Sequence, residues 1–142
     1  MRPWSDPLFY AALAAGPAAA LVLAVWLPAL AWLPGLHYPA QVLLLAILVY
    51  PLLEEWLFRG LLQPWIAGCF HHALGPLSAA NALTSAAFAA LHLLYHPPLW
   101  AAAVFLPSLV FGYFRERNGG VAAPVVLHGG YNAAYYLLLA PI

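Results

Sequence analysis

Long apolar runs, separated by short polar segments, are the feature of this chain that most limits its fold. One helix that spans a bilayer needs about 20 mostly apolar residues, and the run over residues 8–33 alone exceeds that length. Charged residues make up only 6% of the chain, against about 25% in ordinary soluble domains. The sequence therefore predicts an all-α integral membrane protein, which we expect to form a single transmembrane domain over residues 1–142.

Turn signals divide the apolar sequence into about five to six spans. A polar turn is expected at 115–120. The run at 41–66 contains Pro51 and Pro64, so it is either one long kinked helix or two short helices. We expect a compact bundle of about five to six transmembrane helices, with its motif-bearing core at about 41–140. The expected spans are 8–33, 41–66, 78–95, 99–114 and 121–140, with a loop at 68–75.

The distribution of arginine in the short loops predicts an orientation. The first apolar run is longer than the roughly 7–15 apolar residues of a signal peptide, so we expect it to remain as a span. If 41–66 crosses once, Arg2 lies on the same side of the membrane as Arg115 and Arg117. Cytoplasmic loops carry the excess of Lys and Arg, so this side is expected to be cytoplasmic. The alanine-rich, lysine-free composition suits a multi-pass protein of a bacterial cytoplasmic (inner) membrane.

Three ionisable side chains fall inside the second apolar run. A charge at the centre of a spanning helix costs about 3 kcal/mol or more, and such residues usually mark function. Glu55 and Arg59 are four residues apart, so they share one helical face and can neutralise each other. Glu54 is rotated from Glu55 by about 100° and cannot join this pair equally. Glu54 is therefore the candidate general base.

Two further spans carry histidines in helical register with another functional side chain. His92 lies one turn after Phe88, and Asn132 lies one turn after His128. A carboxylate, two imidazoles and an amide that meet in a hydrated cavity can activate water and stabilise an oxyanion. Two other kinds of residue are expected to have no catalytic role. Cys69 is expected to fill apolar space, and the solvated histidines are His37, His71, His72 and His96.

Three ordered motifs carry a family resemblance. They are Glu-Glu-x-x-x-Arg at 54–59, Phe-x-x-x-His at 88–92 and His-x-x-x-Asn at 128–132. In this order they resemble those of the CAAX-protease and bacteriocin-processing (CPBP or Abi) intramembrane endopeptidases. The resemblance implies a glutamate-dependent peptidase in which Glu54 and His92 activate the attacking water, while His128 and Asn132 stabilise the oxyanion. It also implies that Glu55 and Arg59 hold the site together.

The resemblance favours a mechanism with no cofactor, although this group was long described as metalloproteases. If zinc is bound, the expected ligands are Glu54, His92 and His128, which are plausible zinc ligand types. The chain contains neither HExxH nor another closely spaced pair of ligands. We therefore expect no metal, with zinc as the alternative.

The expected substrate is a membrane-tethered protein or peptide, such as one with a C-terminal sorting signal, and membrane lipids are the other expected partners. No basic surface for nucleic acid is present. Two other functions stay open. The polar cluster would also suit a non-catalytic membrane binding or immunity protein, or a small proton-coupled transporter. Many transporters contain a duplicated half, and none is detectable in this sequence.

Overall fold

The computed structural model describes residues 2–26 and 38–139. Its fold is all-α apart from one short hairpin, as the sequence predicts. The elements, in chain order, are η1 (Pro3–Ser5), α1 (Pro7–Trp26), α2 (Ala40–Leu44), η2 (Leu45–Val49), α3 (Tyr50–Glu55), η3 (Trp56–Leu62), α4 (Gln63–Cys69), β1 (Ala73–Leu74), β2 (Leu77–Ser78), α5 (Ala79–His92), α6 (Pro98–Ala103), α7 (Phe105–Asn118) and α8 (Ala122–Leu138).

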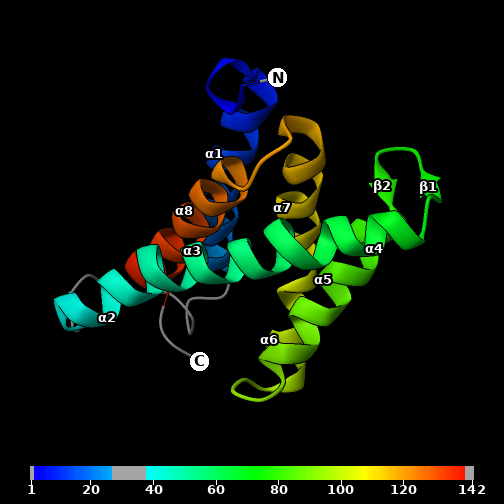
Figure 1. Ribbon diagram of the computed structural model, residues 1–142. Coiled ribbons are helices and arrows are strands. Elements are labelled where there is room, and N and C mark those ends of the chain that lie inside the picture. The colour runs from blue at the N-terminus through cyan, green and yellow to red at the C-terminus, as the bar shows by residue number, and fades with distance from the viewer. Residues whose placement is uncertain (1, 27–37, 140–142) are drawn as a thin grey trace.

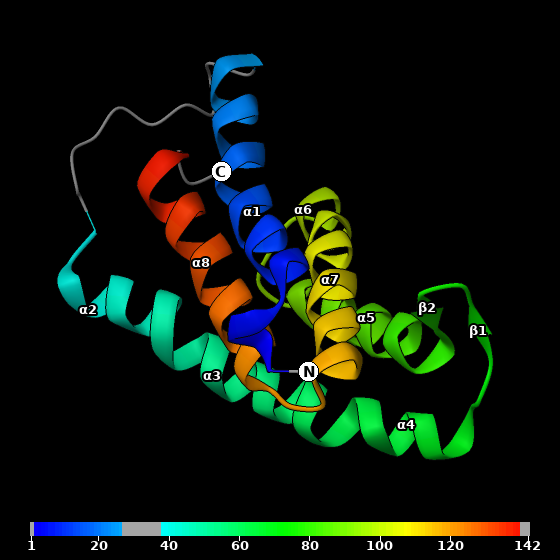
Figure 2. The ribbon, with the colours of Figure 1, turned by 90° about the horizontal axis from the view of Figure 1, so that it is seen from above.

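Helices α1, α7 and α8 pack together, and the continuous helix from α2 to α4 lies across them (Figures 1 and 2). Helix α5 packs against both α4 and α7. A buried hydrophobic cluster joins α1, α7 and α8 through Phe9, Phe111, Phe114 and Leu127. The long crossing helix therefore presents its middle section to α8 and its end to α5.

Residues 40–69 form one unbroken helix, which settles the choice between one helix and two. Two of its sections, η2 and η3, are wider π-helical turns. Each π-turn ends two residues before a proline, Pro51 or Pro64. Proline has no amide hydrogen, and its ring clashes with the carbonyl four residues earlier in an α-helix. The wider turns accommodate the prolines without a break, so the helix continues past both of them.

Within residues 2–26 and 38–139, two helices are long and apolar enough to cross a bilayer, fewer than the five to six spans expected. They are Ala40–Cys69 and Pro98–Asn118. Helix α5 has 14 residues and rises about 21 Å, short of the roughly 30 Å hydrocarbon core. Part of the first expected span, including Pro28, lies outside the described residues, and Pro17 is accommodated inside α1.

Two expected loops differ in the structure. The turn expected at 115–120 begins later, because α7 continues through Asn118 and residues 119–121 connect it to α8. Gly119 has a φ of 75°, the left-handed conformation that ends many helices. In the loop expected at 68–75, α4 extends to Cys69 and an antiparallel hairpin follows. Gly75, with a φ of 59°, supplies the tight turn of this hairpin.

An ion pair closes the end of the bundle where the chain begins. The guanidinium of Arg117 contacts both carboxylate oxygens of Asp6, with 3.2 Å between Nη2 and Oδ1. The pair joins the start of α1 to the end of α7 (Figure 1). The hydrogen bond from Arg117 lowers the pKa of Asp6 below its ordinary value.

Candidate active site

The last turn of α3 places two neighbouring carboxylates in different environments. The side chain of Glu55 is fully buried, whereas that of Glu54 is 32% exposed. Glu55 Oε2 lies 3.3 Å from Arg59 Nε, so these residues form the ion pair that their spacing predicts. The rotation between consecutive helical residues leaves Glu54 on the neighbouring face, where it lines a cavity.

The buried Arg59 is held by α5 and α7 as well as by Glu55. Its Nη2 donates to the backbone carbonyl of Ser108 at 2.8 Å and also to the Ser108 hydroxyl. Its guanidinium carbon lies 5.1 Å from the centre of the Phe88 ring, in cation–π geometry. These contacts compensate the buried cation and fix its position relative to Glu55.

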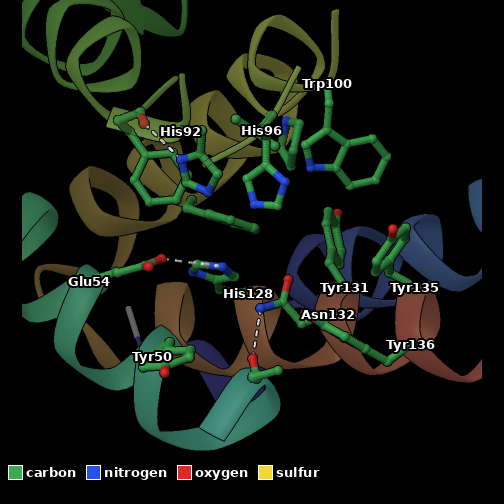
Figure 3. Close-up of a pocket in the computed structure, with 15 residues that line it drawn as sticks. Tyr50, Glu54, His92, His96, Trp100, His128, Tyr131, Asn132, Tyr135 and Tyr136 are labelled. Atoms are coloured by element: carbon green, nitrogen blue, oxygen red, sulfur yellow. Dashed lines mark hydrogen bonds and ion pairs between the residues drawn. The ribbon is translucent and has the colours of Figure 1, made fainter. Parts of the chain in front are cut away.

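His128, on α8, lies between the two carboxylates. Its Nδ1 is 2.9 Å from Glu55 Oε1, and its Nε2 is 3.7 Å from Glu54 Oε2. An ionised carboxylate only accepts hydrogen bonds, so Nδ1 is the donor to Glu55. This bond aims Nε2 at Glu54 and the cavity (Figure 3). The ring also stacks on Phe111, with 5.0 Å between ring centres. The bond from His128 to Glu55 was not predicted, because it joins positions 73 residues apart.

His92, at the end of α5, faces the same cavity from the opposite wall (Figure 3). Its Nδ1 lies 2.9 Å from the backbone oxygen of Phe88. A carbonyl accepts but cannot donate, so this nitrogen carries a hydrogen. In the neutral imidazole, the lone pair is then on Nε2. Glu54 and the Nε2 atoms of both His92 and His128 are thus the candidate proton acceptors.

Asn132 lies one turn after His128 and also lines the cavity. Its Nδ2 donates to the backbone oxygen of Ala46 at 2.8 Å. This carbonyl is available because of the π-turn: the amide of Tyr50 bonds to Leu45, five residues back, and the next residue is Pro51. Proline has no hydrogen with which to continue the series. Asn132 therefore completes the helix with one N–H and retains a second hydrogen on Nδ2.

The close approach of α8 to η2 depends on a glycine. A Cβ atom at Gly129 would lie 2.6 Å from the backbone oxygen of Ile47. No side chain fits this space without a shift of one helix, which explains a glycine beside His128. At Gly130, by contrast, an added Cβ would meet only the end of the Leu13 side chain, at 2.9 Å.

The cavity enclosed by these groups has a volume of about 180 Å³. One water molecule needs only about 10–15 Å³ by this measure, so the polar lining can be hydrated. Glu55 and Arg59 are not part of the lining and lie behind it. Besides the predicted Glu54, His92, His128 and Asn132, the polar and aromatic lining includes Tyr50, Phe88, His96, Trp100, Phe111, Tyr131, Tyr135 and Tyr136.

His96 was expected to be only a solvated histidine, and its place in the cavity lining was not predicted. It is exposed, as expected, but it also reaches the cavity and stacks on His92 with 5.8 Å between ring centres. Partial desolvation, together with the neighbouring His92, lowers the pKa of His96 below its ordinary value. Its spacing of four residues from His92 was the sequence signal for this proximity. The structure places His71, His72 and Cys69 at exposed positions, and His37 lies outside the described residues.

The proposed zinc ligands do not form a metal site. Among residues 2–26 and 38–139, no group of three or more His, Cys, Asp or Glu side chains is arranged to hold a metal ion. Zinc requires ligand distances of about 2.0–2.2 Å to nitrogen or carboxylate oxygen. The Nδ1 atoms of His92 and His128 are engaged with Phe88 and Glu55, so Nε2 is the ring nitrogen of each histidine that faces the cavity and could bind a metal. We assign no step of the reaction to a metal.

Comparison with known proteins identifies the family. The model of the family described as type II CAAX prenyl endopeptidase Rce1-like matches residues 36–134, which include all three motifs. The chain belongs to this family. Its members are embedded in membranes, which agrees with the two apolar helices.

One curated protein is similar to part of this chain. An uncharacterized 24.3 kDa protein of Escherichia coli is 38% identical over 88 residues, which cover 61% of this chain. The match covers 38% of the relative, so the chain spans less than half of that protein. No solved structure matches the chain significantly.

Proposed function

We propose that this chain is an intramembrane endopeptidase that hydrolyses a peptide bond with a water activated by Glu54. One observation carries the proposal: the Glu54 carboxylate and the inward Nε2 atoms of His92 and His128 share one cavity in an apolar bundle. Such residues are costly to bury without a role. Membership of an endopeptidase family supports the reaction class.

In the proposed reaction, Glu54 accepts a proton from a water that His92 helps to hold. The hydroxide attacks the scissile carbonyl carbon and forms a tetrahedral oxyanion. The remaining hydrogen on Asn132 Nδ2 is a donor for that oxyanion, as is Nε2 of His128 when this ring enters the reaction as an imidazolium and keeps its proton throughout. The negative charge of Glu55 balances an imidazolium at His128. The C–N bond then breaks, and the proton taken by Glu54 passes to the leaving amine.

The proposed substrate is a membrane-tethered protein or peptide. An apolar groove of about 500 Å³ adjoins the cavity and shares Trp100, Tyr131 and Asn132 with it. Alanine, glycine and leucine at positions within 15–23 of α1 form one wall. A substrate that enters from the lipid can place an apolar segment here and its scissile bond beside Glu54. A protein with a C-terminal sorting signal has these features.

We further propose a multi-pass position in a bacterial cytoplasmic membrane, with α1, the Ala40–Cys69 helix, α5, the Pro98–Asn118 helix and α8 as five crossings. The ion pair between Asp6 and Arg117 supports an odd number, because it brings the first and fourth helices together at the end where the chain begins. Shorter helices such as α5 can be accommodated by local thinning of the bilayer.

The test compares purified wild-type protein with Glu54→Gln, which preserves size and removes the carboxylate. Peptides that carry a lipid or an apolar helix are the substrates, and mass spectrometry identifies the new terminus. We expect Glu54→Gln to lower kcat by about 10³-fold, while its melting temperature in detergent stays near that of the wild type. Normal turnover by this variant would refute the proposed base. Binding without cleavage by the wild-type protein would instead support a non-catalytic binding or immunity function.

A chelator treatment of the same preparation tests the cofactor. We expect activity to survive dialysis against a strong chelator, because the candidate ligands do not converge on a metal. Loss of activity that zinc restores would overturn the metal-free mechanism and favour the zinc alternative, with Glu54, His92 and His128 as the ligands.

A further inference from the structure

The backbone carbonyl of Arg59 lacks the amide donor that a regular helix supplies. In the π-turn η3, the amide of Gln63 bonds to Phe58, five residues back. The next amide in the series would belong to residue 64 and would reach Arg59. Residue 64 is proline, which has no hydrogen to donate. The carbonyl of Arg59 is therefore left for a donor from outside its own helix.

Arg115 is that donor. Its Nε lies 2.7 Å from the Arg59 oxygen, and Arg115 is half-buried. Arg115 and Ser108 are seven residues apart on α7, so they lie on one face about two turns apart. Ser108 binds the guanidinium of Arg59, while Arg115 binds its backbone. Helix α7 thus holds Arg59 at both ends.

The contacts continue from Arg59 to the cavity. The ion pair at 3.3 Å joins Arg59 to Glu55, and the hydrogen bond at 2.9 Å joins Glu55 to His128. Arg115 does not line the cavity, so it acts only through these residues. We propose that Arg115 is a positioning residue: it fixes the π-turn that carries Arg59 and thereby orients Glu55 and His128. Only the kinetic part of this inference rests on the proposed peptidase function.

Pro64 provides a direct test, because its replacement supplies the missing donor. In Pro64→Ala the new amide can bond to Arg59 in a π-turn, and in an α-turn the amide of Gln63 would reach it instead. The side chain of Pro64 is exposed, so the change removes little packing. We expect Arg115→Met to lower kcat about tenfold, the scale for loss of a hydrogen bond to a charged group, with little change in KM. The double variant Pro64→Ala/Arg115→Met should return kcat to within about threefold of Pro64→Ala.

Arg117→Met is the matched control, because it removes the same charge from the same end of α7. The native Arg117 contacts Asp6, whereas Arg115 contacts Arg59. A second readout is independent of cleavage: the NMR signal of the Nδ1 hydrogen that His128 donates to Glu55, assigned by its loss in His128→Gln. We expect this signal to shift or broaden in Arg115→Met, and to recover in the double variant. It should be unchanged in Arg117→Met.

These outcomes separate the inference from the proposed function. If the wild-type protein cleaves nothing, the NMR comparison still tests the role of Arg115. An Arg115→Met protein with unchanged kcat and an unchanged His128 signal would overturn the inference, as would a double variant no better than the single one. If Arg115→Met does not fold, folding of the double variant with a normal signal supports the inference, and failure of both overturns it.

Discussion

The two π-turns of the long helix solve the same backbone problem in different ways. Each precedes a proline and leaves one carbonyl without a helical donor, at Ala46 in η2 and at Arg59 in η3. The neutral side-chain amide of Asn132, on α8, donates a hydrogen bond to the carbonyl of Ala46. The guanidinium of Arg115, on α7, donates one to the carbonyl of Arg59. The amide also lines the cavity, whereas the guanidinium does not.

This difference separates a residue that can take part in the reaction from one that supports it. Helix α3, which ends with both glutamates, lies between the two π-turns. The first π-turn therefore holds Asn132, a donor that lines the cavity. The second π-turn holds Arg59, which pairs with the buried Glu55 behind the cavity. Restoring a backbone donor should replace Arg115 but should not replace Asn132.

Among the variants that test this comparison, the largest effect is expected for Asn132→Ala. This change removes the donor to Ala46 and the second N–H that we propose for the oxyanion, so kcat should fall by roughly 10²–10³-fold. In Pro51→Ala/Asn132→Ala the new amide can bond to Ala46, so the melting temperature should recover while kcat stays low. Pro51→Ala alone is the control, because Pro51 is buried. Recovery of kcat in the double variant would show that both π-turns serve positioning only.

An intermediate effect is expected for Gly129→Ala. The new Cβ would lie 2.6 Å from the backbone oxygen of Ile47, so α8 must move away from η2, at a cost of about 1–3 kcal/mol. This movement lengthens the bond from Asn132 to Ala46, and we expect kcat to fall about tenfold. The matched control is Gly130→Ala, which meets only the mobile end of Leu13. Urea unfolding and steady-state kinetics of the two variants give the comparison, and equal effects would contradict the role assigned to Gly129.

The smallest effect on activity is expected at the charged end, where neither π-turn is involved. The pKa of Asp6 is lowered when folded, so its ion pair with Arg117 stabilises the protein above the ordinary carboxyl pKa of 3.8 and is lost as the pH falls through the lowered value. Asp6→Asn should reduce the melting temperature near neutral pH and remove this part of the acid dependence. Its kcat should equal that of the wild type. Melting curves from about pH 7 to about pH 3 test this, and a stability difference that persists in acid would contradict it.

The sequence predicts most of the site because its motifs use helical spacing. The pairing of Glu55 with Arg59, and the shared face of His128 and Asn132, follow from a separation of four residues. Contacts between helices could not be predicted this way. The bonds to Ala46 and Arg59 join residues 86 and 56 positions apart.

The fold was predicted less completely than the site. Pro51 and Pro64 left open whether 41–66 is one kinked helix or two short helices, because a proline alone does not say whether a helix breaks or widens into a π-turn. Arg115 was assigned to a polar turn, because the three charges at 115–117 suggest solvent exposure. The structure keeps these residues in α7, where Arg115 bonds to Arg59 and Arg117 to Asp6. Contacts with residues distant in the sequence, rather than the polarity of the segment itself, explain why 115–117 belong to the helix.

The dependence of Arg59 on a donor from another helix also imposes an order on how this chain can change. While residue 64 is proline, loss of Arg115 is harmful. Once residue 64 carries an amide hydrogen, the same loss becomes tolerable. Pro64→Ala is thus a permissive substitution, silent by itself, that must come before any change at Arg115. A mutational library screened in both backgrounds would reveal position 115 as restricted in one and free in the other.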